Sequence, residues 1–207
     1  MRVLSGVKKV GHAGTLDPLA SGVLLVCVGR GVTRQVPRLQ ALEKEYEGTI
    51  LLGIQTDTDD LEGKVIQEKT VPPLTREDVQ RVLGEFTGEI LQVPPVFSAL
   101  VVKGRKSYNL ARRGKEVHSQ ARKVSVKSIE VTSFDPPRIG LKVVCGKGTY
   151  IRALARDLGE RLGTCGVLEK LVRTRIGPYE LKQSWTLDAL AGAAREGRFE
   201  DALMALP

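Results

Sequence analysis

The chain has few cysteines and no long hydrophobic run, and these absences exclude several classes of protein. Its three cysteines, Cys27, Cys145 and Cys165, are far apart in the 207-residue sequence and outside any CxxC or Cys/His pattern. This odd number supports neither a disulfide framework nor a zinc site, so buried thiols are expected. No apolar stretch approaches the roughly 20 residues that span a bilayer, and no hydrophobic signal segment opens the sequence. These features predict a cytoplasmic protein with no membrane partner.

Common motifs for nucleotides and metals are also missing. The sequence has neither a GxxxxGK[ST] phosphate loop nor a GxGxxG turn, which disfavours a nucleoside-triphosphate enzyme. The acidic segment 56–63 invites comparison with a calcium loop, but counting from Asp57 places Glu62 where an EF-hand requires glycine. A solvated or sugar-contacting loop is therefore expected there, and no metal site is predicted.

What the sequence does contain is a glycine-rich loop around one carboxylate, GHAGTLDPLASG at residues 11–22. Its glycines allow tight turns and close approach of a large ligand, while Pro18 disfavours helical geometry at Asp17. The apolar run that follows, at residues 23–28, has no polar alternation and predicts a strand buried on both faces. Asp17 is therefore a candidate active-site residue on a rigidly held loop.

The positive charge of the chain is concentrated in one segment. Residues 101–127 hold nine basic side chains and one acid, whereas the rest of the sequence balances 23 basic against 23 acidic residues. Such a local excess is typical of a surface that binds a polyphosphate, and nucleic acid is the preferred partner. A solvated face and a surface for anionic lipid are the alternatives.

Periodicity alone supports an α+β protein. Helical spacing predicts a helix over 33–42 that is interrupted or bent near Pro37, a capped helix from Thr75, a helix opening near 151, and one or two helices over 186–206. Strands are expected at 46–52 and 64–67, as a hairpin with a long loop, and at 124–134 and 139–145, joined by a proline turn. No internal repeat and no second domain are evident.

Six segments, in this order and at compatible separations, resemble the TruB family of tRNA pseudouridine synthases. They are GHAGTLDPLASG at 11–22, KEYEG at 44–48, QTDTD at 55–59, PPVFSA at 94–99, KGTYIR at 147–152 and RTRIGPY at 173–179. The resemblance covers nearly the whole chain and implies the pseudouridine synthase fold, with a central mixed, mostly antiparallel sheet flanked by helices and a basic RNA-binding insertion. It further implies isomerisation of the uridine at tRNA position 55, in the T-loop, without a cofactor.

The resemblance also assigns roles to individual residues. It implies that Asp17 is the catalytic aspartate, that Tyr46 stacks on the target base and assists proton removal, and that Arg152 pairs with Asp17. His12 resembles the histidine that fills the gap left by an extruded nucleotide. The remaining RNA-binding candidates are Lys103, Arg105, Lys106, Tyr108, Arg112, Arg113, Lys115, Tyr150 and Arg173.

Two departures from the family pattern keep other functions open. The Lys-Pro-x-Gly segment that normally precedes the glycine loop is missing, as is a C-terminal PUA-type domain, so residues 1–207 are expected to form the catalytic domain alone, as a monomer. Residues 1–9 resemble the end of the helix that follows the missing segment. One alternative is a non-catalytic or weakly active tRNA-binding or folding module, and another is a pseudouridine synthase that acts on a different RNA.

Overall fold

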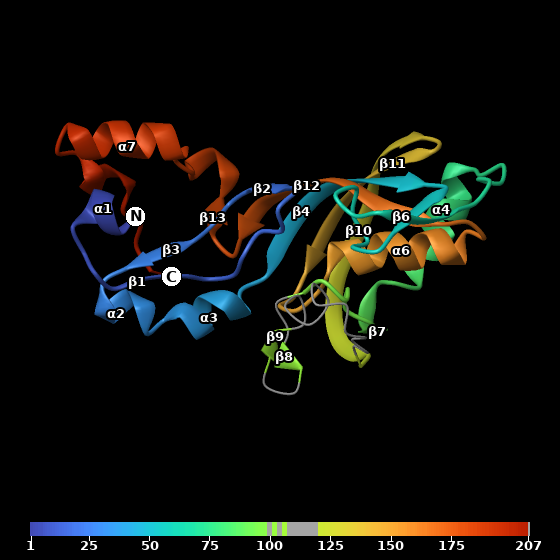
Figure 1. Cartoon of the computed structure of the whole chain (residues 1–207), viewed down its shortest axis with the longest axis horizontal. Coiled ribbons are helices and arrows are strands. Elements are labelled where there is room, and N and C mark those ends of the chain that lie inside the picture. The colour runs from blue at the N-terminus through green and yellow to red at the C-terminus, as the bar shows by residue number, and fades with distance from the viewer. Residues whose placement is uncertain (99–100, 103–104, 107–119, 207) are drawn as a thin grey trace.

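A seven-stranded sheet forms the centre of the part of the chain that the computed structural model describes, residues 1–98, 101–102, 105–106 and 120–206 (Figure 1). Its strands follow the spatial order β13-β12-β4-β11-β10-β7, and β2 pairs with β12. All of these pairings are antiparallel except that of β2 with β12. The mixed, mostly antiparallel sheet predicted from the sequence is therefore confirmed. The strands are β2 (Ala20–Gly22), β4 (Lys44–Leu52), β7 (Gly88–Gln92), β10 (Arg122–Asp135), β11 (Arg138–Cys145), β12 (Gly166–Ile176) and β13 (Tyr179–Glu180).

In the described residues, three two-stranded sheets lie outside this sheet. They are β1 (Val10–His12) with β3 (Val26–Val28), β5 (Ile54–Thr56) with β6 (Val65–Glu68), and β8 (Val101–Val102) with β9 (Arg105–Lys106). The hairpin predicted between segments 46–52 and 64–67 is wrong in its pairing, because β6 pairs with β5. Gly53, with a φ of 91°, separates β5 from β4 and redirects the chain.

The helices largely follow the sequence prediction. Thr75 and Asp78 form the expected capping box of α4, and α6 starts at Ile151. The helix expected over 33–42 is two short helices that are separated at residues 34–35, with Pro37 in the first turn of the second. The α-helices are α1 (Arg2–Ser5), α2 (Arg30–Thr33), α3 (Val36–Ala41), α4 (Arg76–Gly84), α6 (Ile151–Arg161) and α7 (Leu187–Arg195), with 3-10 turns η1 (Leu181–Gln183) and η2 (Phe199–Ala202). None of the described helices is long and apolar enough to cross a membrane.

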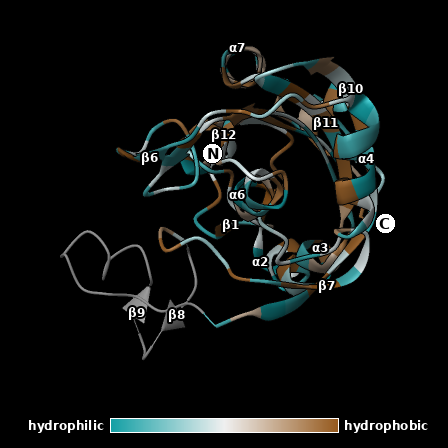
Figure 2. Cartoon of the chain, turned by 90° about the vertical axis from the view of Figure 1, so that its right-hand side faces the viewer, coloured by the Kyte–Doolittle hydropathy of each residue, from teal (hydrophilic) through white to brown (hydrophobic). Residues whose placement is uncertain are grey.

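Two hydrophobic cores lie on either side of the loop between β1 and β2. In the larger core, the sheet curves around α6 and buries Leu154 and Leu158 completely or nearly so (Figure 2). The smaller core lies under α2 and α3 and contains Ala13 and Val23. Leu19, near the end of the loop, packs against the larger core. The loop that carries Asp17 is therefore held by both cores.

The prediction of one buried strand over residues 23–28 is wrong. Only residues 26–28 of this run form a strand, β3, and residues 23–25 lie between it and β2, which ends at Gly22. Gly22 has a φ of 107°, and a Cβ there would lie 2.2 Å from the backbone oxygen of Arg173. The chain turns at this close approach and leaves Leu24 43% exposed. Apolar composition alone could not reveal this corner.

Candidate active site

The carboxylate of Asp17 is bound by the guanidinium of Arg152, although 135 residues separate them. Arg152 Nε lies 2.9 Å from Oδ2 and its Nη2 lies 3.0 Å from Oδ1, a two-pronged geometry that fixes the orientation of both groups. The side chain of Arg152 is only 4% exposed, whereas that of Asp17 is 34% exposed. One face of the carboxylate is therefore held while the other remains accessible to a ligand.

Arg152 is also bonded to two further segments. Its Nη1 donates to the carbonyl of Thr58 at 2.8 Å, and its Nη2 donates to the carbonyl of Phe97 at 3.0 Å. Asp60 Oδ2 lies 3.4 Å from Nη1 and is itself buried. These contacts leave the guanidinium little freedom to follow Asp17 if the loop moves.

The acidic segment is not the solvated loop that the sequence predicts. Asp59 and Asp60 are 7% and 3% exposed, and Thr58 Oγ1 donates to Asp60 Oδ1 at 2.7 Å. The backbone oxygen of Asp60 accepts a bond from Thr56 Oγ1 at 2.6 Å. The carboxylates are drawn inward because α6 presents buried arginines to them. In the described residues, no cluster of His, Cys, Asp and Glu is arranged to hold a metal ion.

A second arginine–aspartate pair lies one turn further along α6. Arg156 Nη1 is 2.9 Å from Asp59 Oδ2, its Nε donates to Asp157, and its Nη2 donates to the carbonyl of Val93. Asp59 has a φ of 61°, which is strained for a residue with a side chain. Burial raises the pKa of Asp59 to about 6, against the lowering effect of Arg156 and Arg152. The strained turn is thus bonded to α6 directly beside Arg152.

Two tyrosines flank the Asp17 carboxylate. Tyr46 lies on β4, and burial raises its pKa; the positive charge of Arg173 lowers this pKa, and the negative charge of Asp17 raises it slightly further. Tyr150 precedes the first turn of α6, and burial raises its pKa as well. The side-chain amide of Gln92 bonds both the backbone N–H and the backbone carbonyl of Tyr150. The site therefore combines one accessible carboxylate, two aromatic rings and two buried cations.

The sequence profile of the TruB family pseudouridylate synthase N-terminal domain matches residues 2–151, and that of the tRNA pseudouridylate synthase B C-terminal domain matches residues 152–206. The chain belongs to the TruB family. Relatives named tRNA pseudouridine synthase B include that of Clostridium tetani, 43% identical over 91% of this chain and 65% of the relative. That of Bacteroides fragilis is 47% identical over 84% of this chain and 75% of the relative.

Solved structures resemble this TruB-family chain over nearly its whole length. A chain of a Cbf5-Nop10-Gar1 complex covers 97% of it with a TM-score of 0.72 and 29% sequence identity. A chain of an H/ACA RNP bound to a substrate RNA containing 2'-deoxyuridine gives a TM-score of 0.69 and 26% identity. This chain spans about half the length of these two, 53% and 51%. The pseudouridine synthase fold implied by the sequence resemblance is confirmed.

Arg173, which the sequence predicts to contact RNA, is buried in this TruB-family chain. The residue is 3% exposed, and its Nε donates to the carbonyl of Val23 at 2.7 Å while Nη1 donates to the carbonyl of Thr15 at 3.2 Å. Thr15 belongs to the loop that carries Asp17, and Val23 directly follows β2. This placement favours an internal role over a direct contact with RNA.

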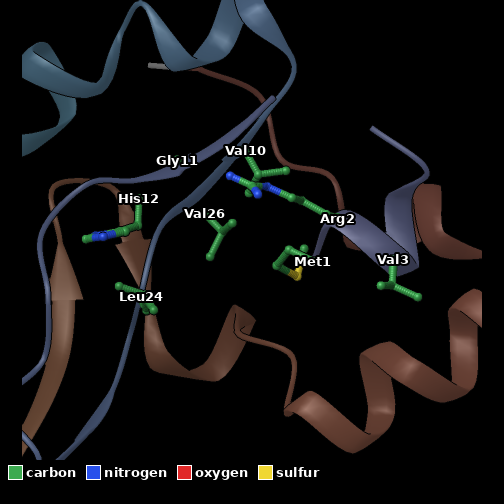
Figure 3. Close-up of a pocket in the computed structure, with 8 residues that line it drawn as sticks. All are labelled: Met1, Arg2, Val3, Val10, Gly11, His12, Leu24 and Val26. Atoms are coloured by element: carbon green, nitrogen blue, oxygen red, sulfur yellow. The ribbon is translucent and has the colours of Figure 1, made fainter. Parts of the chain in front are cut away.

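His12 lies at the end of β1, on the surface. It borders a pocket of about 520 Å³ whose other lining residues are mainly apolar and include Met1, Val10 and Val26. In Figure 3, His12 lies at one end of this pocket and Val3 at the other. The exposure of the ring is compatible with the RNA contact that the family resemblance implies.

The predicted basic segment is described only in part. Arg105 and Lys106 form β9, which pairs with β8. Lys103, Tyr108, Arg112, Arg113 and Lys115 lie outside the described residues. Their assignment to RNA binding stays a prediction.

Sequence reasoning misses Asp59, Asp60 and Arg156 as parts of the site. The sequence indicates Asp59 only as part of the QTDTD segment, and it predicts a surface loop for the acidic run. The available signal is the presence of two arginines four residues apart on the helix after KGTYI, since such residues share a helix face. A buried helix face with two cations requires anionic partners, and the acidic turn supplies them.

Proposed function

We propose that this chain converts uridine to pseudouridine in the T-loop of tRNA, at position 55. The observation that carries the proposal is the Asp17 carboxylate, held on one side by buried Arg152 and accessible on the other, in a TruB-family chain. The names of the curated relatives support tRNA as the substrate. The chain covers 65% and 75% of the length of these two relatives.

The isomerisation requires a nucleophile, and the site offers the Asp17 carboxylate. Uracil must leave C1′ through N1, rotate, and bond again to C1′ through C5, and one well-placed carboxylate can serve both halves as nucleophile. Arg152 orients the Asp17 carboxylate through two ionic hydrogen bonds, and such bonds strengthen where water is excluded. Neither half of the isomerisation consumes a cofactor.

A base within a folded T-loop must be turned out of its stack before Asp17 can reach it. In the proposal, Tyr46 stacks on the extruded uracil, and His12 occupies or supports the space that the nucleotide leaves. Tyr150 adds a second aromatic ring near the carboxylate, and the basic segment holds the phosphates of the T-arm stem.

The proposal is tested with an unmodified T-arm stem-loop and a control in which the target uridine is replaced by cytidine. Pseudouridine is mapped after incubation with wild-type chain and with Asp17→Asn. We expect modification at position 55 of the first RNA by the wild type only. Binding of both RNAs without pseudouridine would identify a passive tRNA-binding module instead.

A second candidate function is favoured by one comparison. The similar H/ACA RNP chain is described as bound to a substrate RNA containing 2'-deoxyuridine, so an RNA other than tRNA is a second possible substrate of this chain. Supplying total RNA in parallel with the stem-loop distinguishes the two, since modification outside tRNA would favour this candidate. We further propose that the chain is cytoplasmic and monomeric. Size-exclusion chromatography with light scattering tests the monomeric state.

A further inference from the structure

Arg173 is a buried cation with no carboxylate partner among the described residues. Its side chain is enclosed, with only 3% of the residue exposed, and two of its nitrogens donate to carbonyl groups near Asp17. The third, Nη2, is buried and makes no hydrogen bond of normal geometry with a described group. Burying a charge with an unused donor is costly, so this arrangement calls for a role beyond packing.

The group that faces this cation is the phenol of Tyr46. Arg173 on β12 lies directly opposite Tyr46 on β4, and paired residues in an antiparallel ladder project to the same side of the sheet. The charge of Arg173 lowers the pKa of Tyr46, although burial has the larger and opposite effect. The free donor and the phenol are therefore close enough to influence one another.

The other groups around Tyr46 do not compensate the cation. Cys145 on β11 is a buried thiol whose pKa is raised by burial to about 11, and Asp17 already binds Arg152. Lys44, also on β4, is a second cation, and its ammonium donates to the carbonyls of Gln40 and Leu42. Among these groups, Tyr46 is the acid that lies directly opposite Arg173 in the sheet.

A purely mechanical role explains only part of the geometry. The bonds from Nε and Nη1 account for an anchor between β12 and the Asp17 loop. A neutral side-chain amide has two N–H donors and could supply both of these bonds without burying a charge. The mechanical interpretation leaves the charge and Nη2 without a function.

We propose that Arg173 is a positioning residue for Tyr46: it orients the hydroxyl through Nη2 and balances negative charge on the phenol oxygen when Tyr46 acts as a base. This assignment rests on the proposed function. In this assignment, Arg152 binds the carboxylate of Asp17, and Arg173 acts on the phenol of Tyr46.

The step served by Arg173 is removal of the proton from C5 after uracil has bonded to C1′ through C5. The C5–H bond breaks and its electron pair forms the C5–C6 double bond, while the C6–N1 π pair returns to N1. The proton bonds to the Tyr46 phenolate oxygen, and N1 takes a proton from water. Hydroxide then removes the proton from Tyr46, so the phenolate is restored and no net proton is consumed.

The first test follows ionisation of Tyr46 directly, without RNA. Tyrosine carrying ¹³C at Cζ is incorporated, the Tyr46 signal is assigned by its absence in Tyr46→Phe, and the signal is titrated with pH. We expect Arg173→Met to raise the pKa of Tyr46 by about one unit or more, because a neighbouring positive charge is removed. If Arg173→Met does not fold by circular dichroism, Arg173→Lys, which lacks an atom equivalent to Nη2, is expected to raise it by a smaller amount. An unchanged titration in a folded variant would overturn the proposal.

The second test is a double-mutant cycle on the single-turnover rate. With Tyr46 present, Arg173→Lys should slow the reaction about 10-fold or more at saturating RNA, whereas in Tyr46→Phe the same change should have little further effect. Equal losses in both backgrounds would show that Arg173 is only a loop anchor. If the wild type makes no pseudouridine, the proposed function fails, and the titration alone then decides whether Arg173 acts on Tyr46.

Discussion

The guanidinium of Arg152 binds both oxygens of the Asp17 carboxylate. Replacing this carboxylate with an amide removes its charge and barely alters the shape of the side chain. We expect Asp17→Asn to abolish pseudouridine formation while the stem-loop dissociation constant changes by less than about threefold, because the nucleophile is removed and the RNA surface is kept. Pseudouridine mapping and filter binding measure the two effects. Asp57→Asn, on an exposed carboxylate of the acidic turn, is the matched control and should retain activity. Normal turnover by Asp17→Asn would remove Asp17 from its proposed role.

Gly22 occupies a position that has no room for a side chain. A Cβ at this position would lie 2.2 Å from the Arg173 carbonyl oxygen, on a backbone with a φ of 107°. Gly22→Ala should therefore lower the free energy of unfolding by about 2–4 kcal/mol. Gly31→Ala, in α2 where the new Cβ meets nothing within 4 Å, should leave it unchanged or raise it slightly. Thermal and urea unfolding compare the two, and equal stability of both variants would contradict this account.

At the scale of elements, the contact between α6 and the acidic turn should depend on pH. Asp59 has a pKa raised by burial to about 6, against 3.8 for an unperturbed aspartate. The folded chain therefore holds a proton on Asp59 in this window that the unfolded chain has released. The resulting contribution to stability is complete below about pH 4 and disappears as the pH rises past about 6.

Asp59→Asn removes this titration. The free energy of unfolding of Asp59→Asn minus that of the wild type should increase by up to about 3 kcal/mol between about pH 4 and pH 7. Asp57→Asn provides the control, because its carboxylate is exposed. Urea unfolding at several pH values measures the difference. A difference that is flat with pH for Asp59→Asn would show that burial does not perturb this carboxylate.

Elements with local signals could be predicted from the sequence, and those defined by distant partners could not. The capping box of α4 and the apolar periodicity of α6 are encoded within one or two turns. The corner at Gly22 depends on β12, about 150 residues away, and the burial of Asp59 depends on Arg156. No pattern within the acidic turn itself indicates that Asp59 binds Arg156, which lies 97 residues later on α6.

For the whole molecule, the distribution of charge predicts how RNA is bound. The segment 101–127 carries the entire net charge of +8 and contains no candidate nucleophile like Asp17. Replacing Arg112, Arg113 and Lys115 with glutamine should weaken stem-loop affinity and flatten its salt dependence, by up to about one unit of slope for each phosphate that is no longer neutralised. Saturating RNA should restore much of the rate.

A matched variant separates local from general charge effects. Replacing Arg81, Lys182 and Arg195, three exposed cations elsewhere on the chain, removes the same net charge. It should change affinity and salt slope much less, as measured by filter binding over a salt series. Equal effects of both triple variants would show that RNA responds only to total charge.

The partners of Arg152 also determine when the site can form during folding. Asp17, Thr58 and Phe97 lie 135, 94 and 55 residues from it along the chain, and each belongs to a different segment. Closing loops of this length costs entropy that only the completed sheet and both cores repay, so the contacts are late events. An intermediate with α6 or a hairpin formed would have no assembled carboxylate–guanidinium pair. During refolding, catalytic competence should return together with the last phase of native structure rather than ahead of it.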